Sequence, residues 1–86
     1  MNALLYKFEI KGDFSTLGKT NEEFVENLQR SAHFLKGYEQ MPIEEYMDGY
    51  AKRAWMLGGL VIRSWTPDIF VEDMINCGLL KKSVVQ

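Results

Sequence analysis

Near the start of the chain, apolar and charged residues alternate strictly from Tyr6 to Lys11. The alternating residues are apolar Tyr6, Phe8 and Ile10 and charged Lys7, Glu9 and Lys11. A period of two is typical of a β-strand with one face in water. We therefore predict a strand over 3–11 that ends at Gly12.

A helical period follows from Thr20 to about Lys36. The apolar residues that share one face at helical spacing are Phe24, Val25, Leu28, Ala32 and Leu35. Thr20 and Glu23 have the spacing of a capping box, in which Thr20 accepts from the Glu23 N–H and the Glu23 carboxylate reaches back to the Thr20 N–H. Gly37 is a natural stop for this helix.

A second helix is predicted from Pro42 to about Leu57, because proline suits the first helical position and Gly58-Gly59 ends the pattern. The apolar stripe expected to face the core consists of Ile43, Tyr46, Met47, Tyr50, Ala54 and Leu57. Trp55 and Met56 do not belong to this stripe. They fall among charged residues on the polar side, close to the helix end.

The last part of the chain alternates between strand and helix signals. The β-branched run 60–65, bounded by Gly59 and Pro67, predicts a strand. Thr66-Pro67-Asp68 is a helix start, and Gly78 ends the helix. Residues 79–85 fit an edge strand whose lysine pair discourages further pairing.

These elements give an α+β fold in the order β-α-α-β-α-(β), with a short antiparallel sheet packed against three helices. The chain has 86 residues, which leaves no room for a second core, so we expect one domain over 1–86. Composition agrees with a folded chain, since 47% of residues are hydrophobic and 26% are charged.

The stretch Gly12–Thr20 comes nearest to a chemical motif. A phosphate-binding loop reads G-x-x-x-x-G-K-[ST], and Gly18-Lys19-Thr20 supplies its last three positions. Asp13 occupies the place of the first glycine, where a carboxylate repels phosphate. We interpret the stretch as a turn leading into a helix cap, and we keep nucleotide binding by a degenerate loop as an alternative.

Charge and cysteine content exclude several classes. Ten basic and twelve acidic residues are spread evenly and give a net charge of −2, whereas nucleic-acid binders usually present a basic stripe. Cys77 is the single cysteine, so no intrachain disulfide can form. The sequence has no signal peptide and no apolar run long enough for a bilayer, which predicts a protein of the reducing cytosol.

Catalytic residues are not indicated. Adjacent acids occur at 22–23, 44–45 and 72–73, but neighbouring helical residues point to different sides. His33 and Cys77 would need to meet in space to act as a nucleophilic pair, and we interpret Cys77 as a packing residue near a helix end. We therefore predict no enzyme activity, no metal and no cofactor.

The positive signal is a group of aromatic, methionine and arginine residues of the type enriched at protein interfaces. The predicted partner-binding residues are Trp55, Met56, Arg53, Arg63 and Trp65. The competing interpretation is burial under the 60–65 strand.

We expect a small non-catalytic cytosolic protein that acts by protein–protein interaction. Its partner would be a second copy in a homodimer or a larger host enzyme or complex that it inhibits or adapts. Short acidic chains of this kind are common among phage and mobile-element accessory proteins, an association of size and composition only. The alternatives are a nucleic-acid-associated regulator and the nucleotide-binding protein described above.

Overall fold

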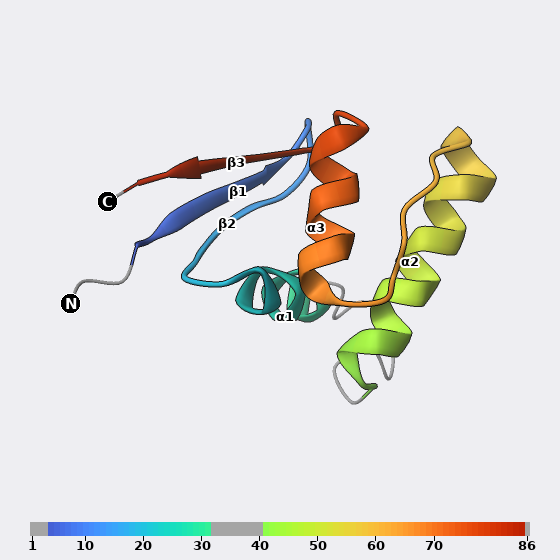
Figure 1. The fold of residues 1–86 in the computed structure, drawn as a ribbon, viewed down its shortest axis with the longest axis horizontal. Helices are drawn as coiled ribbons and strands as arrows, with labels where there is room; N and C mark the ends of the chain where they lie inside the picture. The colour runs from blue at the N-terminus through green and yellow to red at the C-terminus, as the bar shows by residue number, and fades with distance from the viewer. Residues whose placement is uncertain (1–3, 32–40, 86) are drawn as a thin grey trace.

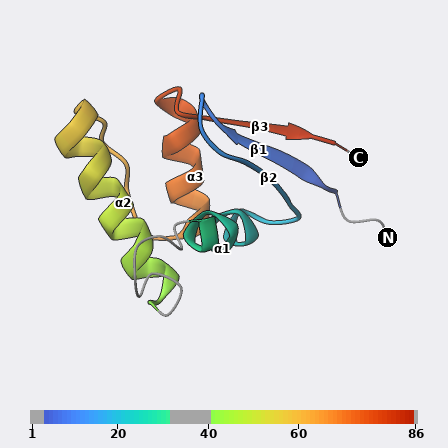
Figure 2. The same cartoon turned by 180° about the vertical axis from the view of Figure 1, so that it is seen from behind.

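The structure is a computed structural model that describes residues 4–31 and 41–85. It has an α+β fold in which helices cover one face of a three-stranded antiparallel sheet (Figures 1 and 2). Its elements are β1 (Tyr6–Ile10), β2 (Ser15–Gly18), α1 (Asn21–Ser31), α2 (Ile43–Gly58), α3 (Pro67–Asn76) and β3 (Leu80–Val84).

β1 is the central strand, and the strand order is β2-β1-β3. Lys7 lies opposite Leu17 on β2 and Ser83 on β3. A tight turn joins β1 to β2: the Asp13 N–H donates to the Ile10 carbonyl over 3.0 Å, and Gly12 has a φ of 72°, which glycine adopts without strain. β3 forms one edge, as its sequence predicted.

The buried side chains form one cluster between the sheet and the helices. Its members are Phe8, Ile10, Phe24, Val25, Leu28, Tyr46, Met47, Ile62, Phe70, Val71, Met74 and Leu80. Phe8 of β1 stacks on Phe24 of α1, with ring centroids 4.8 Å apart. Ring stacking of this kind adds specific geometry to the burial of apolar area.

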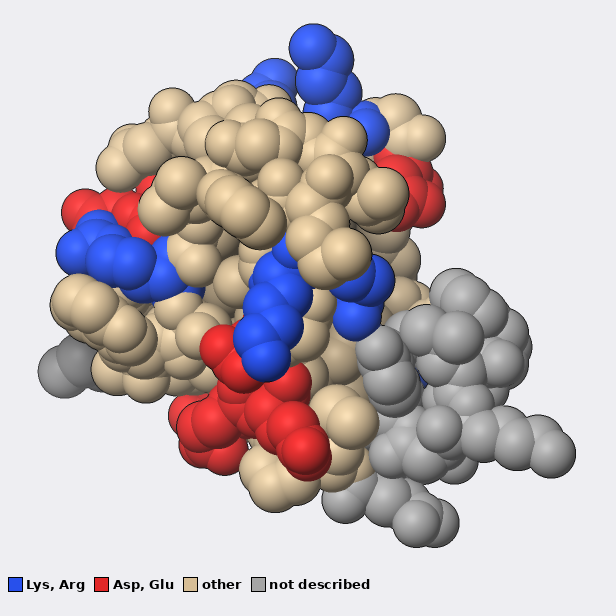
Figure 3. Space-filling model, turned by 90° about the vertical axis from the view of Figure 1, so that its right-hand side faces the viewer, with Lys and Arg blue, Asp and Glu red and all other residues tan. Residues whose placement is uncertain are grey.

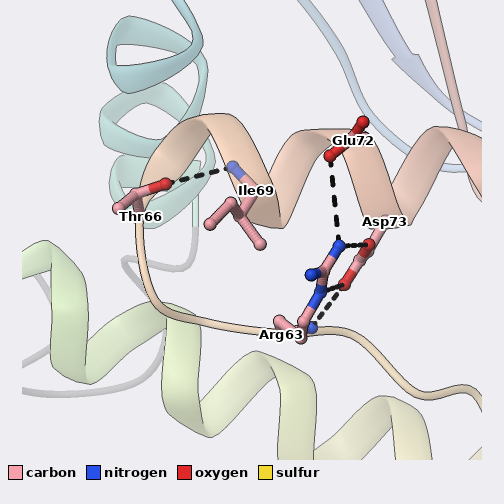
Figure 4. Close-up of polar contacts among 5 residues, drawn as sticks. All are labelled: Arg63, Thr66, Ile69, Glu72 and Asp73. Carbon is pink, nitrogen blue, oxygen red and sulfur yellow. Dashed lines mark hydrogen bonds and ion pairs between the residues drawn. The ribbon is translucent and has the colours of Figure 1, made fainter.

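The helix starts follow from local hydrogen bonds. Thr66 Oγ1 accepts from the Ile69 N–H over 3.1 Å (Figure 4), and Thr20 Oγ1 accepts from the Glu23 N–H over 3.1 Å. The second half of the expected capping box differs, because Glu23 Oε1 accepts from the Lys19 N–H over 2.9 Å. The end of the first helix, expected near Lys36 and Gly37, lies outside the described residues.

The element order is β-β-α-α-α-β, which corrects two sequence predictions. β2 was not predicted: its sequence STLG has one large apolar residue, and that residue, Leu17, is exposed. The predicted strand 60–65 is wrong. The described residues form one sheet of β2, β1 and β3, and residues 60–65 run as an extended segment between α2 and α3 (Figures 1 and 2).

α2 lies on the far side of the helical layer from the sheet (Figures 1 and 2). Its first half packs into the core through Tyr46 and Met47, and Tyr50 meets Phe70 of α3 edge to face at 5.6 Å. Its last turns continue past the core, so their apolar side chains are exposed to solvent.

Candidate functional site

α2 ends at a sharp reversal of the chain. Gly59 adopts the left-handed conformation with a φ of 69°, its N–H donates to the Trp55 carbonyl over 2.9 Å, and the Leu60 N–H donates to the Ala54 carbonyl over 3.3 Å. A glycine in this conformation is a common way to end a helix, because no Cβ opposes it. The chain then returns alongside α2, and this return places 60–65 next to the last turns of the helix.

A groove lies between α2 and the returning segment, with a volume of about 460 Å³. Four of the five predicted partner residues line it: Trp55, Met56, Arg63 and Trp65. The sequence had these residues on two separate elements, and the reversal at Gly59 brings them together.

The apolar side chains around this groove are open to water. Trp55 is 64% exposed, Met56 74% and Trp65 70%. Two neighbours outside the predicted set are also open, Leu57 at 86% and Val61 at 74%. We call these five residues the α2-end surface; Figure 3 shows this side of the molecule, where uncharged side chains cover a broad area over the end of α2 with charged groups around it.

Leu57 corrects the predicted core stripe of α2. Helical spacing placed it on the core face, but the core ends before the last turn of the helix, so the same face meets solvent there. The apolar run Leu57-Gly58-Gly59-Leu60-Val61 was the available signal, because five uncharged residues at a helix end have no polar group to face water.

The arginine Arg63 fixes the returning segment to α3 (Figure 4). Its Nε and Nη2 donate to the two oxygens of Asp73, and its backbone N–H donates to Oδ2, each over 2.8 Å. Glu72 lies 4.0 Å from Nη2. These bonds hold the pKa of Asp73 well below its usual 3.8, at about 2, and raise the pKa of Arg63.

Further contacts hold the same segment. Ile62 is buried in the core, and Ser64 Oγ donates to Asp48 of α2 over 3.3 Å. The Arg63 guanidinium carbon also lies 5.4 Å from the centre of the Trp65 ring, a distance at which a cation is attracted to the ring face. The segment is thus attached to α2, to α3 and to the core. This wall of the groove is therefore already ordered before any partner binds.

Arg53, the fifth predicted partner residue, lies apart from the groove. Its guanidinium carbon is 5.8 Å from the Tyr50 ring centre, and it lines a second apolar hollow of about 350 Å³ with Leu57, Leu60 and Leu79. Burial raises the pKa of the Tyr50 hydroxyl, and the charge of Asp13 raises it further. The Tyr50 hydroxyl therefore stays protonated, and the side chain uncharged, at physiological pH.

The stretch Gly12–Thr20 forms a turn, a strand and a cap. Residues 15–18 pair with β1 as β2, and Gly18 is buried, where an added Cβ would lie 3.4 Å from atoms of Phe8 and Glu23. The Glu23 carboxylate accepts a hydrogen bond from the Lys19 N–H, so this N–H is already bonded within the chain. A phosphate-binding loop needs free backbone N–H groups that converge on one point, and this geometry gives that alternative no support.

Cys77 is half-buried at the end of α3, where its thiol lies 3.4 Å from the Met74 carbonyl. His33, its conceivable catalytic partner, lies outside the described residues. In the ranges 4–31 and 41–85, no three His, Cys, Asp or Glu side chains are grouped to hold a metal ion. No described helix is long and apolar enough to cross a membrane.

Comparison with known proteins returns no relative: no protein-family model, no curated protein and no solved structure matches this chain. The α2-end surface is therefore interpreted from its own geometry.

Proposed function

We propose that this protein is non-catalytic and acts by binding another protein through the α2-end surface. The observation that carries the proposal is the exposure of five large apolar side chains, two of them tryptophans, around the last turns of α2 and the segment that returns beside them. Monomeric proteins rarely leave large apolar patches open, and tryptophan is among the residues that most often dominate binding energy.

The fixed position of the groove supports the same conclusion. Arg63, Ile62 and Ser64 hold the returning segment through three independent contacts. Binding to a surface that is already ordered loses less conformational entropy than binding to a mobile loop. Trp65 and Val61 are therefore displayed on a rigid support.

Affinity capture from the native cell tests the proposal. The wild-type chain, Trp55→Ala and Leu17→Ala serve as three baits, because Leu17 is also exposed but lies on β2 at the sheet. We expect to identify a protein that is captured equally by the wild type and by Leu17→Ala. Trp55→Ala should weaken its binding by at least about 1–2 kcal/mol.

Equal recovery of every captured protein by wild type and Trp55→Ala would show that the α2-end surface does not bind them. A binding site elsewhere on the chain would then have to be sought. Circular dichroism melts of all three baits confirm that they are equally folded.

A further inference from the structure

We propose that the occupant of the α2-end surface is a second copy of this chain, in a two-fold symmetric dimer. This inference rests on the proposed function, since it names the partner of the same surface. The first argument is size. Trp55, Met56, Leu57, Val61 and Trp65 together expose on the order of 700 Å², close to the ~800 Å² that each partner contributes to a standard interface.

The second argument is shape. The last turn of α2 is a ridge that carries Met56 and Leu57, with the 460 Å³ groove on one side and the 350 Å³ hollow on the other. A two-fold interface uses the same patch on both copies, so the patch must be complementary to itself, and a projection beside a depression meets this requirement. The α2-end surface supplies the ridge and borders both depressions, so the ridge of each copy can enter a depression of the other.

The third argument is charge. The cations on the border of the groove are compensated within their own copy, Lys52 by Asp48 at 3.6 Å and Arg63 by Asp73 at 2.8 Å. Like charges brought face to face oppose association. Because these ion pairs balance the charges along the groove, two copies meet there without that penalty; Arg53 lines the other depression.

Both tryptophans of the chain belong to this surface, which gives the dimer an intrinsic reporter. Emission of Trp55 and Trp65 should shift to shorter wavelength when the surface is covered. We expect that shift to follow concentration from about 1 µM to about 1 mM, a range that corresponds to ordinary dimer affinities. Sedimentation over the same range should give the same dissociation constant.

Met56→Glu places a charge at the ridge and keeps a good helix former. It should raise the dissociation constant of the dimer by at least about 30-fold. The tryptophan emission should then stay at the wavelength of the dilute protein at every concentration. Leu17→Glu is the matched control, since Leu17 is exposed on β2 and faces Lys7 across the sheet. It should dimerise as the wild type does.

A wild-type chain that stays monomeric at about 1 mM overturns the dimer but leaves the proposed function standing if Trp55→Ala still loses a captured partner. A dimer that persists in Met56→Glu, or that forms without any change in tryptophan emission, also overturns it, because the copies then pair through another face. Failure of both self-association and Trp55-dependent capture overturns the proposed function itself.

Discussion

Arg63, one of the predicted partner-binding residues, also holds the surface in place. The sequence suggested a partner-binding arginine, but its guanidinium and its backbone N–H are bonded to Asp73. Its first role in the structure is to hold residues 60–65 in place. The tryptophan next to it, Trp65, is displayed because of that attachment.

The Arg63–Asp73 contact predicts a dependence of stability on pH. The pKa of Asp73 falls from 3.8 to about 2 on folding, so the unfolded chain takes up a proton more readily than the folded one. The contribution is complete above pH 3.8 and is lost as the pH falls toward 2. We expect the free energy of unfolding to fall more steeply across this window in the wild type than in Asp73→Asn, as measured by urea denaturation at each pH; parallel curves would contradict this.

Thr20 and Lys19 separate the two interpretations of the Gly12–Thr20 stretch. Thr20→Ala removes the bond to the Glu23 N–H and should cost about 1 kcal/mol of stability. Lys19→Ala leaves its own backbone N–H bonded to Glu23 and should change the melting temperature little. A folded Lys19→Ala protein that loses activity would restore the phosphate-binding alternative.

Cys77 should behave as a packing residue. Its half-buried thiol rests against the last turn of α3, so it should react slowly with thiol reagents in the native state, and Cys77→Ala should keep partner binding. Thiol labelling with and without denaturant measures the difference. Fast native labelling together with loss of function on replacement would indicate a reactive cysteine.

Among the elements, α2 combines two environments in one helix. Met47 in its first half is fully buried, whereas Met56 in its last turns is 74% exposed. Met47→Ala should therefore cost about 2–5 kcal/mol of stability, and Met56→Ala about 0.5 kcal/mol or less. Urea denaturation of the two variants tests this contrast; equal losses would mean that the end of α2 is part of the core.

The sequence predicted the elements that have strong local signals and missed those defined by tertiary contacts. The Thr66 cap, the edge strand β3 and the helix α2 follow from proline, glycine and apolar spacing, and the structure confirms them, the ends of α2 to within one residue. Pro42 takes the N-cap position of α2 rather than the first helical position that the sequence predicted. The segment 60–65 has strand-forming residues, but no strand in the described part of the chain pairs with it; Arg63 bonds it to a helix instead. Ser15–Gly18 has weak strand residues and pairs because the turn at Gly12 brings it to β1.

The candidate site was predicted in part for a similar reason. Trp55 and Met56 could be recognised because helical spacing placed them off the apolar stripe. Trp65 lies beside them only because the chain reverses at Gly59, and helical spacing does not predict that reversal. Leu57 was assigned wrongly because spacing gives the face of a residue but not the point where the core ends.

At the scale of the whole molecule, two features argue against the alternative functions. The strand β2 fills the place of a nucleotide-binding loop, and the even charge distribution lacks the basic stripe of a nucleic-acid binder. ATP with Mg²⁺ should not raise the melting temperature, because a ligand stabilises only what it binds. Duplex DNA should show no salt-dependent binding. Thermal shift and fluorescence anisotropy measure these two outcomes, and a clear stabilisation or a steep salt dependence would favour the nucleotide or the nucleic-acid alternative.

The pairing of β1 with β3 has a consequence for the rate of folding. The Val85 N–H donates to the Leu5 carbonyl over 2.8 Å, so the two ends of the sheet could be joined by a short linker and the chain reopened between Gly58 and Gly59. This circular permutant would read β3, β1 and β2 in succession, which turns the sheet into a meander of neighbouring strands. Because closing long loops slows folding, stopped-flow refolding should show the permutant forming its sheet faster than the natural chain does.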